Sequence, residues 1–288
     1  MYPSPAGEAF LVNGVWHQDY NIQDPVTGVV SVKRYMHNGV DWVEAPSAGA
    51  KIDLMKRIPD TKSGINLKKN VINLDKCLVD LTKYGGPDMT NHEARVAVIM
   101  DYSGSMRPLY KNGNIQRTLN RLIPLALRFD DNGELDVWLF HSGFKHLDSM
   151  ALDNYEDYVE EVMMGSGERF GSTSYGPVLT DAYNKYVNEV PSKVPTFIIF
   201  ITDGSNNDRK VTNDIIKKTS HQNIFVQFVG IGDMDDFVYL KRLDDLKGRP
   251  VDNTGFIEIE DFDNVSDDKL YTELLSQYID WLKVKGIM

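Results

Sequence analysis

The residues best suited to chemistry are two carboxylates and three hydroxyls that lie in loops beside apolar, strand-like segments. They are Asp101, Ser103, Ser105, Thr173 and Asp203. The first three alternate directly after the apolar run 95–100, and the last closely follows the apolar run 196–201. Carboxylate and hydroxyl oxygens suit hard cations, whereas Zn²⁺ prefers His and Cys ligands. The pattern therefore predicts a site for Mg²⁺, with Mn²⁺ or Ca²⁺ as alternatives, in which one coordination position stays open to an outside ligand.

From about residue 61, strand and helix patterns alternate, which is typical of an α/β sheet that is mostly parallel. The predicted strands are 95–100, 134–141, 196–201, 223–230 and 255–260, with a short antiparallel edge strand at 144–147. The predicted helices are 114–129, 153–163, 176–189, 209–219, 235–245 and 268–284. Pro124 should bend the first of these helices or weaken its hydrogen bonding. Because ligands bind outside the carboxyl ends of the strands in such sheets, we expect the three loops to converge.

Residues 1–60 differ in sequence pattern from the rest of the chain. The pairs Asn13-Gly14 and Asn38-Gly39 are flanked by strand-forming residues, which is a strong signal for tight hairpin turns. Short antiparallel strands are expected at 29–36 and 40–43, and a linker at 45–50. So small a sheet buries too little apolar area to be stable alone and should dock on the main domain or on a partner. We therefore divide the chain into a β-hairpin-rich appendage with its linker, 1–60, and an α/β domain, 61–288.

The composition is that of an ordinary soluble globular protein of 288 residues, with 42% hydrophobic and 25% charged residues. A formal net charge of -11 argues against nucleic-acid binding, because phosphates would be repelled. The single Cys77 cannot form an internal disulfide, and we expect a buried, inert thiol. The longest purely apolar run, 197–201, is far shorter than the roughly 20 residues that span a bilayer, and the N-terminus lacks signal-peptide features. We therefore predict a cytoplasmic protein without a membrane span.

The order Asp-x-Ser-x-Ser, then Thr, then Asp resembles the metal-ion-dependent adhesion site of the von Willebrand factor A (vWA) domain family. All five positions match, and the resemblance extends over residues 61–285. It implies a Rossmann-like, doubly wound and mostly parallel sheet with one antiparallel edge strand. It also implies that the three hydroxyls bind the metal, usually Mg²⁺, and that Asp101 and Asp203 bind it directly or through water. An acidic side chain from a partner protein would complete the shell.

Further segments are similar to the bacterial TerF-type branch of this family, which is associated with tellurium resistance. They are 109–113, 115–117, 127–138, 173–179, 237–246 and the lead-in 65–69. The chain departs from that branch at 70–92, which is longer than usual, and in its first 60 residues. The resemblance implies a cation-dependent adaptor rather than an enzyme, acting in tellurite or general stress response with Ter-type proteins as partners. Arg107, Lys111 and Arg169 are expected near the metal loops, where they would attract an acidic ligand.

The main alternative is a metal-dependent hydrolase of phosphatase or nuclease type. Metal catalysis usually needs more carboxylates and a general base near the ion, so the hydroxyl-rich set favours binding. A third possibility is a structural subunit whose site is empty. In a purely structural interpretation, Asp101 and Asp203 cap the following helices and the hydroxyls bond loop amides. The segment 165–171 misses the dinucleotide fingerprint by one residue, and 172–176 lacks the first glycine of a nucleophile elbow. No spacing marks His141, His146 or His221 as a catalytic base.

Overall fold

The computed structural model describes residues 4–5, 10–12, 15–23, 30–37, 42–44, 54–83, 86–130, 132–204, 206–232 and 237–288. The chain divides into two compact units, 1–54 and 55–288. This division falls a few residues before the predicted boundary at residue 60.

The first unit contains an antiparallel sheet. Its strands are β1 (Ser4–Pro5), β2 (Phe10–Val12), β3 (Val15–Gln23), β4 (Val30–His37) and β5 (Trp42–Glu44). They are ordered β1-β3-β4-β5, and β2 also pairs with β3. The rings of Tyr20 and Tyr35, from the two long strands, meet edge to face at 5.3 Å. The predicted turns at Asn13-Gly14 and Asn38-Gly39 and the predicted linker at 45–50 lie outside the described residues.

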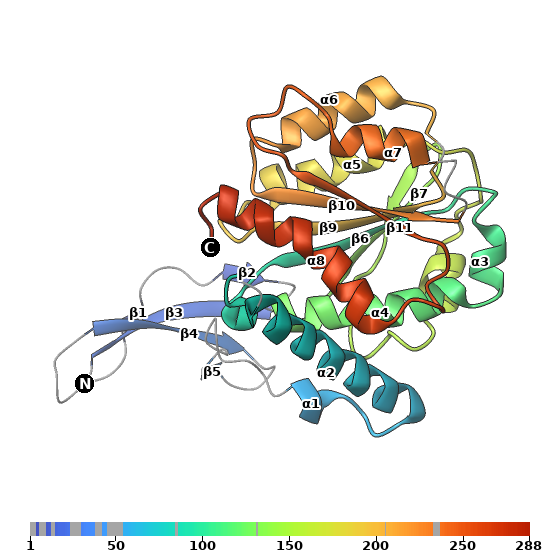
Figure 1. Cartoon of the computed structure of the whole chain (residues 1–288). Coiled ribbons are helices and arrows are strands. Elements are labelled where there is room, and N and C mark those ends of the chain that lie inside the picture. The colour runs from blue at the N-terminus through green and yellow to red at the C-terminus, as the bar shows by residue number, and fades with distance from the viewer. Residues whose placement is uncertain are drawn as a thin grey trace. The chain divides into compact units, whose positions relative to one another are not determined.

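The second unit is built on a six-stranded sheet in the order β11-β10-β9-β6-β7-β8 (Figure 1). The strands are β6 (Arg95–Asp101), β7 (Asp136–Phe140), β8 (Phe144–His146), β9 (Thr196–Thr202), β10 (Ile224–Ile231) and β11 (Thr254–Ile259). All neighbouring strands are parallel except β7 and β8. The predicted α/β sheet with one antiparallel edge strand is therefore confirmed. Because the strand order reverses between β6 and β9, the crevice for a ligand is expected at their carboxyl ends.

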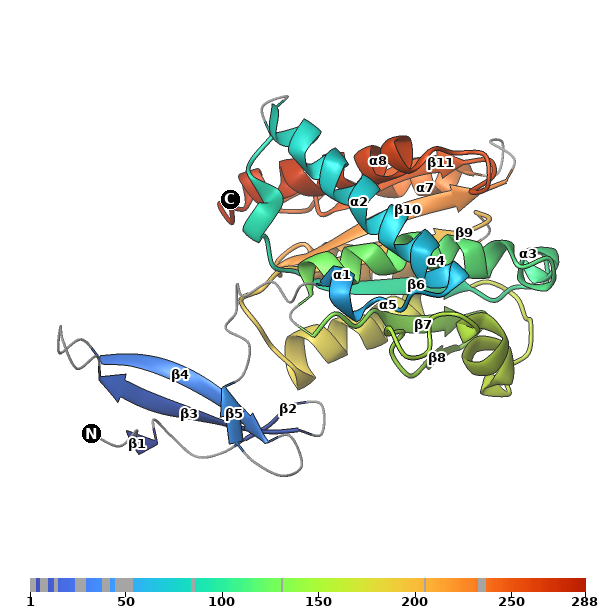
Figure 2. The ribbon, with the colours of Figure 1, turned by 90° about the horizontal axis from the view of Figure 1, so that it is seen from below.

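Helices cover both faces of this sheet. The α-helices are α1 (Leu54–Arg57), α2 (Lys62–Lys83), α3 (Arg107–Lys111), α4 (Asn114–Phe129), α5 (Gly176–Tyr183), α6 (Arg209–Thr219), α7 (Val238–Asp244) and α8 (Asp267–Val284). Helices α2, α4 and α8 pack together on one face, which Figure 2 views from below, and α5, α6 and α7 cover the other. None of the helices among the described residues is both long and apolar enough to cross a bilayer.

The central strand β9 is buried along its whole length, as its continuously apolar sequence predicted. Alternate side chains point to opposite faces: the ring of Phe200 packs against Tyr175 at 4.8 Å, and that of Phe197 stacks on Tyr278 at 4.5 Å. Burying an aromatic or large aliphatic side chain of this kind contributes about 1.5–3 kcal/mol. The loops at the ends of β6 and β9 are therefore held by a firmly packed core.

Two helical regions differ from the sequence-based prediction. Helix α2 was not predicted, because exposed Ile65, Ile72 and Val79 on its outer face blur the apolar period that its buried residues set. The predicted helices at 153–163 and 176–189 are partly π-helical. The π-helical turns are Val159–Met163 and Asn184–Glu189.

Pro124 lies inside α4 but does not end it. A proline removes one backbone donor, which in a regular helix would leave the carbonyl oxygen of Asn120 without its partner. The side-chain amide of Asn70, on α2, donates to that carbonyl oxygen at 3.0 Å. Packing against α2 therefore compensates for the interruption that the sequence predicted.

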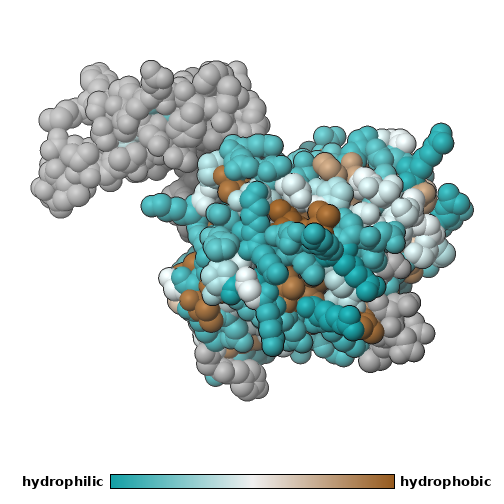
Figure 3. Space-filling view, turned by 90° about the horizontal axis from the view of Figure 1, so that it is seen from above, coloured by the Kyte–Doolittle hydropathy of each residue, from teal (hydrophilic) through white to brown (hydrophobic). Residues whose placement is uncertain are grey.

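The outer face formed by α5, α6 and α7 is mostly hydrophilic, with separate hydrophobic spots (Figure 3). Val211 of α6 and Val238 of α7 are exposed there. Scattered exposed apolar residues are normal on soluble domains, so this face gives no reason to place a binding site on it.

Candidate metal centre

Asp101 is the last residue of β6, at the point where the strand order reverses, and its side chain is fully buried. Both carboxylate oxygens accept hydrogen bonds. The backbone N–H of Ser103 donates to Oδ1 at 2.7 Å, and the hydroxyl of Thr202 donates to Oδ2 at 2.7 Å. The hydroxyl of Tyr110 donates to the Asp101 carbonyl oxygen at 2.8 Å. The carboxylate is therefore oriented by its own loop and by the neighbouring strand β9.

The loop after β6 is joined to the loop that precedes α5. Ser103 pairs with Gly171 in an isolated parallel bridge. The N–H of Gly104 donates to the Gly171 carbonyl oxygen at 3.0 Å, and the N–H of Gly171 donates to the Tyr102 carbonyl oxygen at 3.2 Å. The hydroxyl oxygens of Ser103 and Ser105 lie 3.1 Å apart, the first residue buried and the second exposed. Two of the predicted hydroxyl ligands are thus adjacent, and Ser105 opens the pair to solvent.

The loop before α5 is joined in turn to the loop after β9. Thr173 is buried, and its carbonyl oxygen accepts the N–H of Asn207 at 3.0 Å. The carboxylate of Asp208 accepts the N–H groups of Tyr175 and Gly176 at 3.0 and 2.9 Å. It thereby satisfies backbone donors at the start of α5 that no helical carbonyl can reach. Hydrogen bonds therefore connect all three loops that carry predicted ligands.

Asp203 follows the last residue of β9 and is half-buried. The next residue, Gly204, has a φ of 103°, a backbone conformation that a residue with a Cβ adopts only under strain. The Oδ1 atom of Asp203 is buried and has no hydrogen-bond partner among the described residues. Leaving a buried acceptor unsatisfied costs about 1–3 kcal/mol, and more for a charged one. A bound cation would satisfy this oxygen.

The negative charge of Asp203 acts on the buried carboxylate of Asp101. Burial raises the pKa of Asp101 to about 7, and the negative charge of Asp203 adds to this shift, while hydrogen bonds from Thr202 and Ser103 oppose it. A divalent cation between the two carboxylates would replace their repulsion by attraction. Among the described residues, no group of three or more His, Cys, Asp or Glu side chains is arranged to hold a metal. A shell that combined the two carboxylates with the nearby hydroxyl oxygens would be all-oxygen, and such a set fits Mg²⁺, Mn²⁺ or Ca²⁺.

Sequence reasoning missed Thr202 and Tyr175. Thr202 donates its only hydroxyl proton to Asp101, so the hydroxyl of Tyr175, 3.1 Å away, must donate to Thr202. Thr202 also accepts the N–H of Gly204 at 3.2 Å. Both residues therefore position the site rather than line it. The Thr-Asp-Gly sequence at the strand end was the available signal for Thr202, whereas the role of Tyr175 depends on how α5 packs.

An aromatic cluster holds the first loop against the second. The ring of Tyr102 stacks on Phe170 with centroids 4.0 Å apart, and Tyr110 meets both rings edge-on. The guanidinium of Arg107 lies 5.0 Å over the Phe170 ring, and both Arg107 and Arg169 are exposed. The third predicted basic residue, Lys111 at the end of α3, is exposed as well. Arg107 and Arg169 flank the two loops that carry predicted ligands, where their charge would attract an acidic partner.

His141 lies beside this cluster of loops, but its ring is engaged. Its Nδ1 accepts the N–H of Gly143 at 3.0 Å, which leaves the proton on Nε2, and Nε2 donates to Glu168 at 2.9 Å. Its carbonyl oxygen accepts the N–H of Ser174 at 3.0 Å. These contacts hold the glycine-rich segment 165–171 in place, which is a structural role.

The sequence model of the vWA domain found at the TerF C terminus matches residues 93–287 of this chain. The matched region contains all five predicted metal ligands. The uncharacterized protein YcbR of Bacillus subtilis (strain 168) is 43% identical over 205 residues, which cover 69% of this chain and 83% of YcbR.

Solved structures with a similar fold include the manganese-loaded TRAP protein of Plasmodium vivax. It has a TM-score of 0.48 and 21% identity, over 66% of this chain and 74% of that one. The mussel byssus protein PTMP1 with a zinc-occupied MIDAS motif has a TM-score of 0.46 and 15% identity, over 69% of this chain and 51% of that one. The SpRpn10 VWA domain has a TM-score of 0.43 and 13% identity, over 65% and 95%.

Proposed function

Because the chain belongs to the family of vWA domains found at the TerF C terminus, we propose that it is a divalent-cation-dependent protein-binding module. The ion would be held by the five residues that the sequence singled out, Asp101, Ser103, Ser105, Thr173 and Asp203. Mg²⁺ is the expected ion, with Mn²⁺ or Ca²⁺ as alternatives. The partner would be a protein that supplies an acidic side chain.

The observation that carries this proposal is the unsatisfied carboxylate oxygen of Asp203 beside the buried carboxylate of Asp101. Two carboxylates that repel each other, with one oxygen buried and unpartnered, form an unfavourable arrangement unless a cation binds. The neighbouring hydroxyls of Ser103 and Ser105 add neutral oxygen donors without adding charge. Bound there, a divalent ion would supply positive charge for a carboxylate from outside.

Affinity capture tests the binding function. The purified chain would be immobilised and incubated with cell lysate in Mg²⁺, in Mg²⁺ with excess chelator, and in Mg²⁺ after Asp101→Ala. We expect a partner protein that is retained in the first case and lost in the other two. Retention that is unchanged by chelator and by the substitution would contradict the proposal.

Hydrolysis is the competing function, and we propose binding instead because the predicted ligand set combines three hydroxyls with only two carboxylates. A hydrolase would need a general base beside the ion, and the ring of His141 is occupied by Gly143 and Glu168. Assays of phosphoester cleavage decide between the two functions. Mg²⁺-dependent turnover that disappears in Asp101→Ala would overturn the adaptor function.

A role in tellurite or general stress response, with Ter-type proteins as partners, belongs to the same proposal and is supported by family membership alone. Deletion of the gene should lower the tellurite concentration that its host tolerates, and the wild-type gene should restore tolerance. An Asp101→Ala gene that restores tolerance fully would separate this role from the metal centre.

A further inference from the structure

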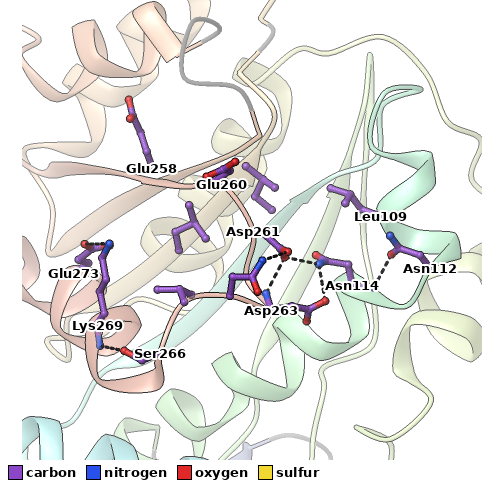
Figure 4. A pocket seen from close by; sticks show the side chains of 14 residues that line it. Leu109, Asn112, Asn114, Glu258, Glu260, Asp261, Asp263, Ser266, Lys269 and Glu273 are labelled. Carbon is purple, nitrogen blue, oxygen red and sulfur yellow. Dashed lines mark hydrogen bonds and ion pairs between the residues drawn. The ribbon is translucent and has the colours of Figure 1, made fainter.

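A pocket apart from the candidate metal residues lies at the carboxyl ends of β10 and β11, between the loop after β11 and the start of α4 (Figure 4). The pocket has a volume of about 800 Å³. Leu109, Ile231, Ile259 and Val265 give it an aliphatic part, and the remaining lining is mostly polar. A ligand that fits this pocket needs an apolar stem as well as a polar head.

The polar part of the pocket is acidic. Its charged residues are Glu258, Glu260, Asp261, Asp263, Glu273 and Lys269. Three of the five carboxylates are paired. Asp263 accepts two hydrogen bonds from Arg117 at 2.8 and 2.7 Å, Glu258 pairs with Lys241, and Glu273 lies 3.7 Å from Lys269.

Among the described residues, the remaining two carboxylates have no basic partner of their own, although the charge of Arg117, the partner of Asp263, also acts on Asp261. Asp261 accepts hydrogen bonds from neutral groups, namely the N–H of Asp263 at 2.9 Å and the side-chain amides of Asn264 at 2.8 Å and Asn114 at 3.3 Å. Among the described residues, neither Asp261 nor the exposed Glu260 forms an ion pair. The pocket therefore keeps negative charge that a cationic ligand would neutralise.

The side chain of Asn114 provides independent evidence that a hydrogen-bond donor is missing from this pocket. It is the first residue of α4 and is 6% exposed. Its amide nitrogen points at Asp261 and Asp263, toward the acidic part of the pocket (Figure 4). Its Oδ1 atom is buried and has no hydrogen-bond partner among the described residues. A group that donates hydrogen bonds to a carboxylate and to an amide oxygen together would satisfy both features.

We propose that this pocket binds an alkyl guanidinium or alkyl ammonium group, the chemistry shared by basic side chains and by free polyamines. The charged head donates to Asp261, Glu260 and the Asn114 amide oxygen, and the alkyl stem packs on the aliphatic part of the pocket. A metal ion fits less well, because an ion gains nothing from aliphatic walls. The site does not depend on the metal centre.

Calorimetric titration of the full chain with n-butylguanidinium tests the proposal, and n-butylurea serves as an uncharged probe of the same shape. We expect saturable binding of the first and none of the second at the same concentration. Asp261→Asn should weaken the affinity about tenfold and Glu260→Gln about threefold, as charge-assisted and more exposed contacts do. The matched control is Asp280→Asn, which removes an exposed carboxylate of α8 outside the pocket and should change nothing.

Further measurements distinguish a polyamine from a protein side chain as the ligand, and they separate this proposal from the metal-binding proposal. Spermidine and a capped Gly-Gly-Arg-Gly-Gly peptide are compared, and the tighter one identifies a polyamine or a protein side chain as the ligand. Asp101→Ala should leave binding of n-butylguanidinium unchanged even if the metal proposal fails. Because Glu260 is exposed, Glu260→Gln should fold normally. It therefore still tests the proposal if Asp261→Asn does not fold. Equal binding of n-butylguanidinium and n-butylurea, or an equal loss in Asp280→Asn, would overturn the proposal.

Discussion

The carboxyl edge of the sheet carries two acidic clusters that are stabilised in opposite ways. Between the first half of α4 and the segment that leads into α8, Arg117 pairs with Asp263 at 2.7 Å, and Arg121 pairs with Asp267 at 2.7 Å. At the ends of β6 and β9, Asp101 receives hydrogen bonds from neutral groups, and its acidic neighbour retains a buried oxygen without a partner.

The difference shows how to separate a structural acidic cluster from a binding site. A carboxylate that already has an arginine gains little from an outside cation, whereas one that faces another carboxylate gains much. Counting acidic residues would rank the two clusters alike. The partners of each carboxylate decide which cluster is ready to bind an ion.

The largest effect is expected at the arginine-paired cluster. Arg121→Ala removes the partner of Asp267, whose side chain is 18% exposed, together with donors to the carbonyl oxygens of Phe262 and Val265. Loss of one partner from a mostly buried pair should lower the free energy of unfolding by about 3–5 kcal/mol. Urea denaturation measures this, with the exposed Lys283→Ala as control. A loss below about 1 kcal/mol would mean that this pair is not structural.

At the other cluster, Asp101→Asn should raise the free energy of unfolding of the metal-free protein and should remove the stabilisation that metal gives the wild type. The change removes a buried charge and its repulsion, so the metal-free protein should become more stable by about 1–2 kcal/mol. Wild type should gain about 2.7 kcal/mol at a Mg²⁺ concentration 100 times its Kd, and the variant should gain nothing. Thermal denaturation with and without Mg²⁺ gives both values. Equal Mg²⁺ responses of the two proteins would show that Asp101 does not contribute to binding.

Thr173→Val sharpens the comparison, because it removes a hydroxyl oxygen and leaves the side-chain volume and the charge of the site almost unchanged. If the Thr173 hydroxyl is a metal ligand, calorimetry should find Mg²⁺ binding about tenfold weaker, which corresponds to about 1.4 kcal/mol. Thr180→Val is the matched control, because the Thr180 hydroxyl donates to a carbonyl oxygen within α5. A similar loss of affinity in both variants would contradict a ligand role for Thr173.

The smallest effect is expected for Arg117→Ala, because the Arg117 and Asp263 side chains are 50% and 39% exposed. The free energy of unfolding should fall by about 0.2–1 kcal/mol, and less in high salt. Arg117 lowers the pKa of Asp263, so the contribution of the pair is present above the ordinary value of 3.8 and is lost as the pH falls through the lowered folded-state value. Denaturation at pH 7 and pH 2 measures this. An equal effect at both pH values would exclude the ion pair as its cause.

The strands and most helices could be predicted because their patterns are local. The apolar run 196–201 became β9, and the amphipathic segment 114–129 became α4. The exposed apolar side chains of α2 obscured the helical spacing of its buried residues, so α2 was not predicted. Helix α4 continues through Pro124 because Asn70 of α2 bonds the carbonyl oxygen that the proline leaves without a donor. Local patterns therefore predict an element where its apolar residues face the core, and fail where they do not.

That the three loops carrying the candidate metal residues lie together could also be predicted, because such loops gather at the carboxyl edge of an α/β sheet. The neighbours of these residues could not. Thr202 reaches Asp101 because β9 lies beside β6 in a particular register. Tyr175 reaches Thr202 because its ring, just before α5, packs on Phe200 of β9. A ligand role for the five residues stays a prediction until metal binding is measured.

The sequence by itself determined the donor chemistry, the order of the elements and the family, since residue types and local periodicity express these directly. The tertiary structure alone decided which carboxylates are neutralised. Asp263 is paired with an arginine 146 positions away in the chain, whereas Asp203 is left with an unsatisfied oxygen. Charge compensation and burial depend on contacts between segments that are distant in the chain, and only folding brings those segments together.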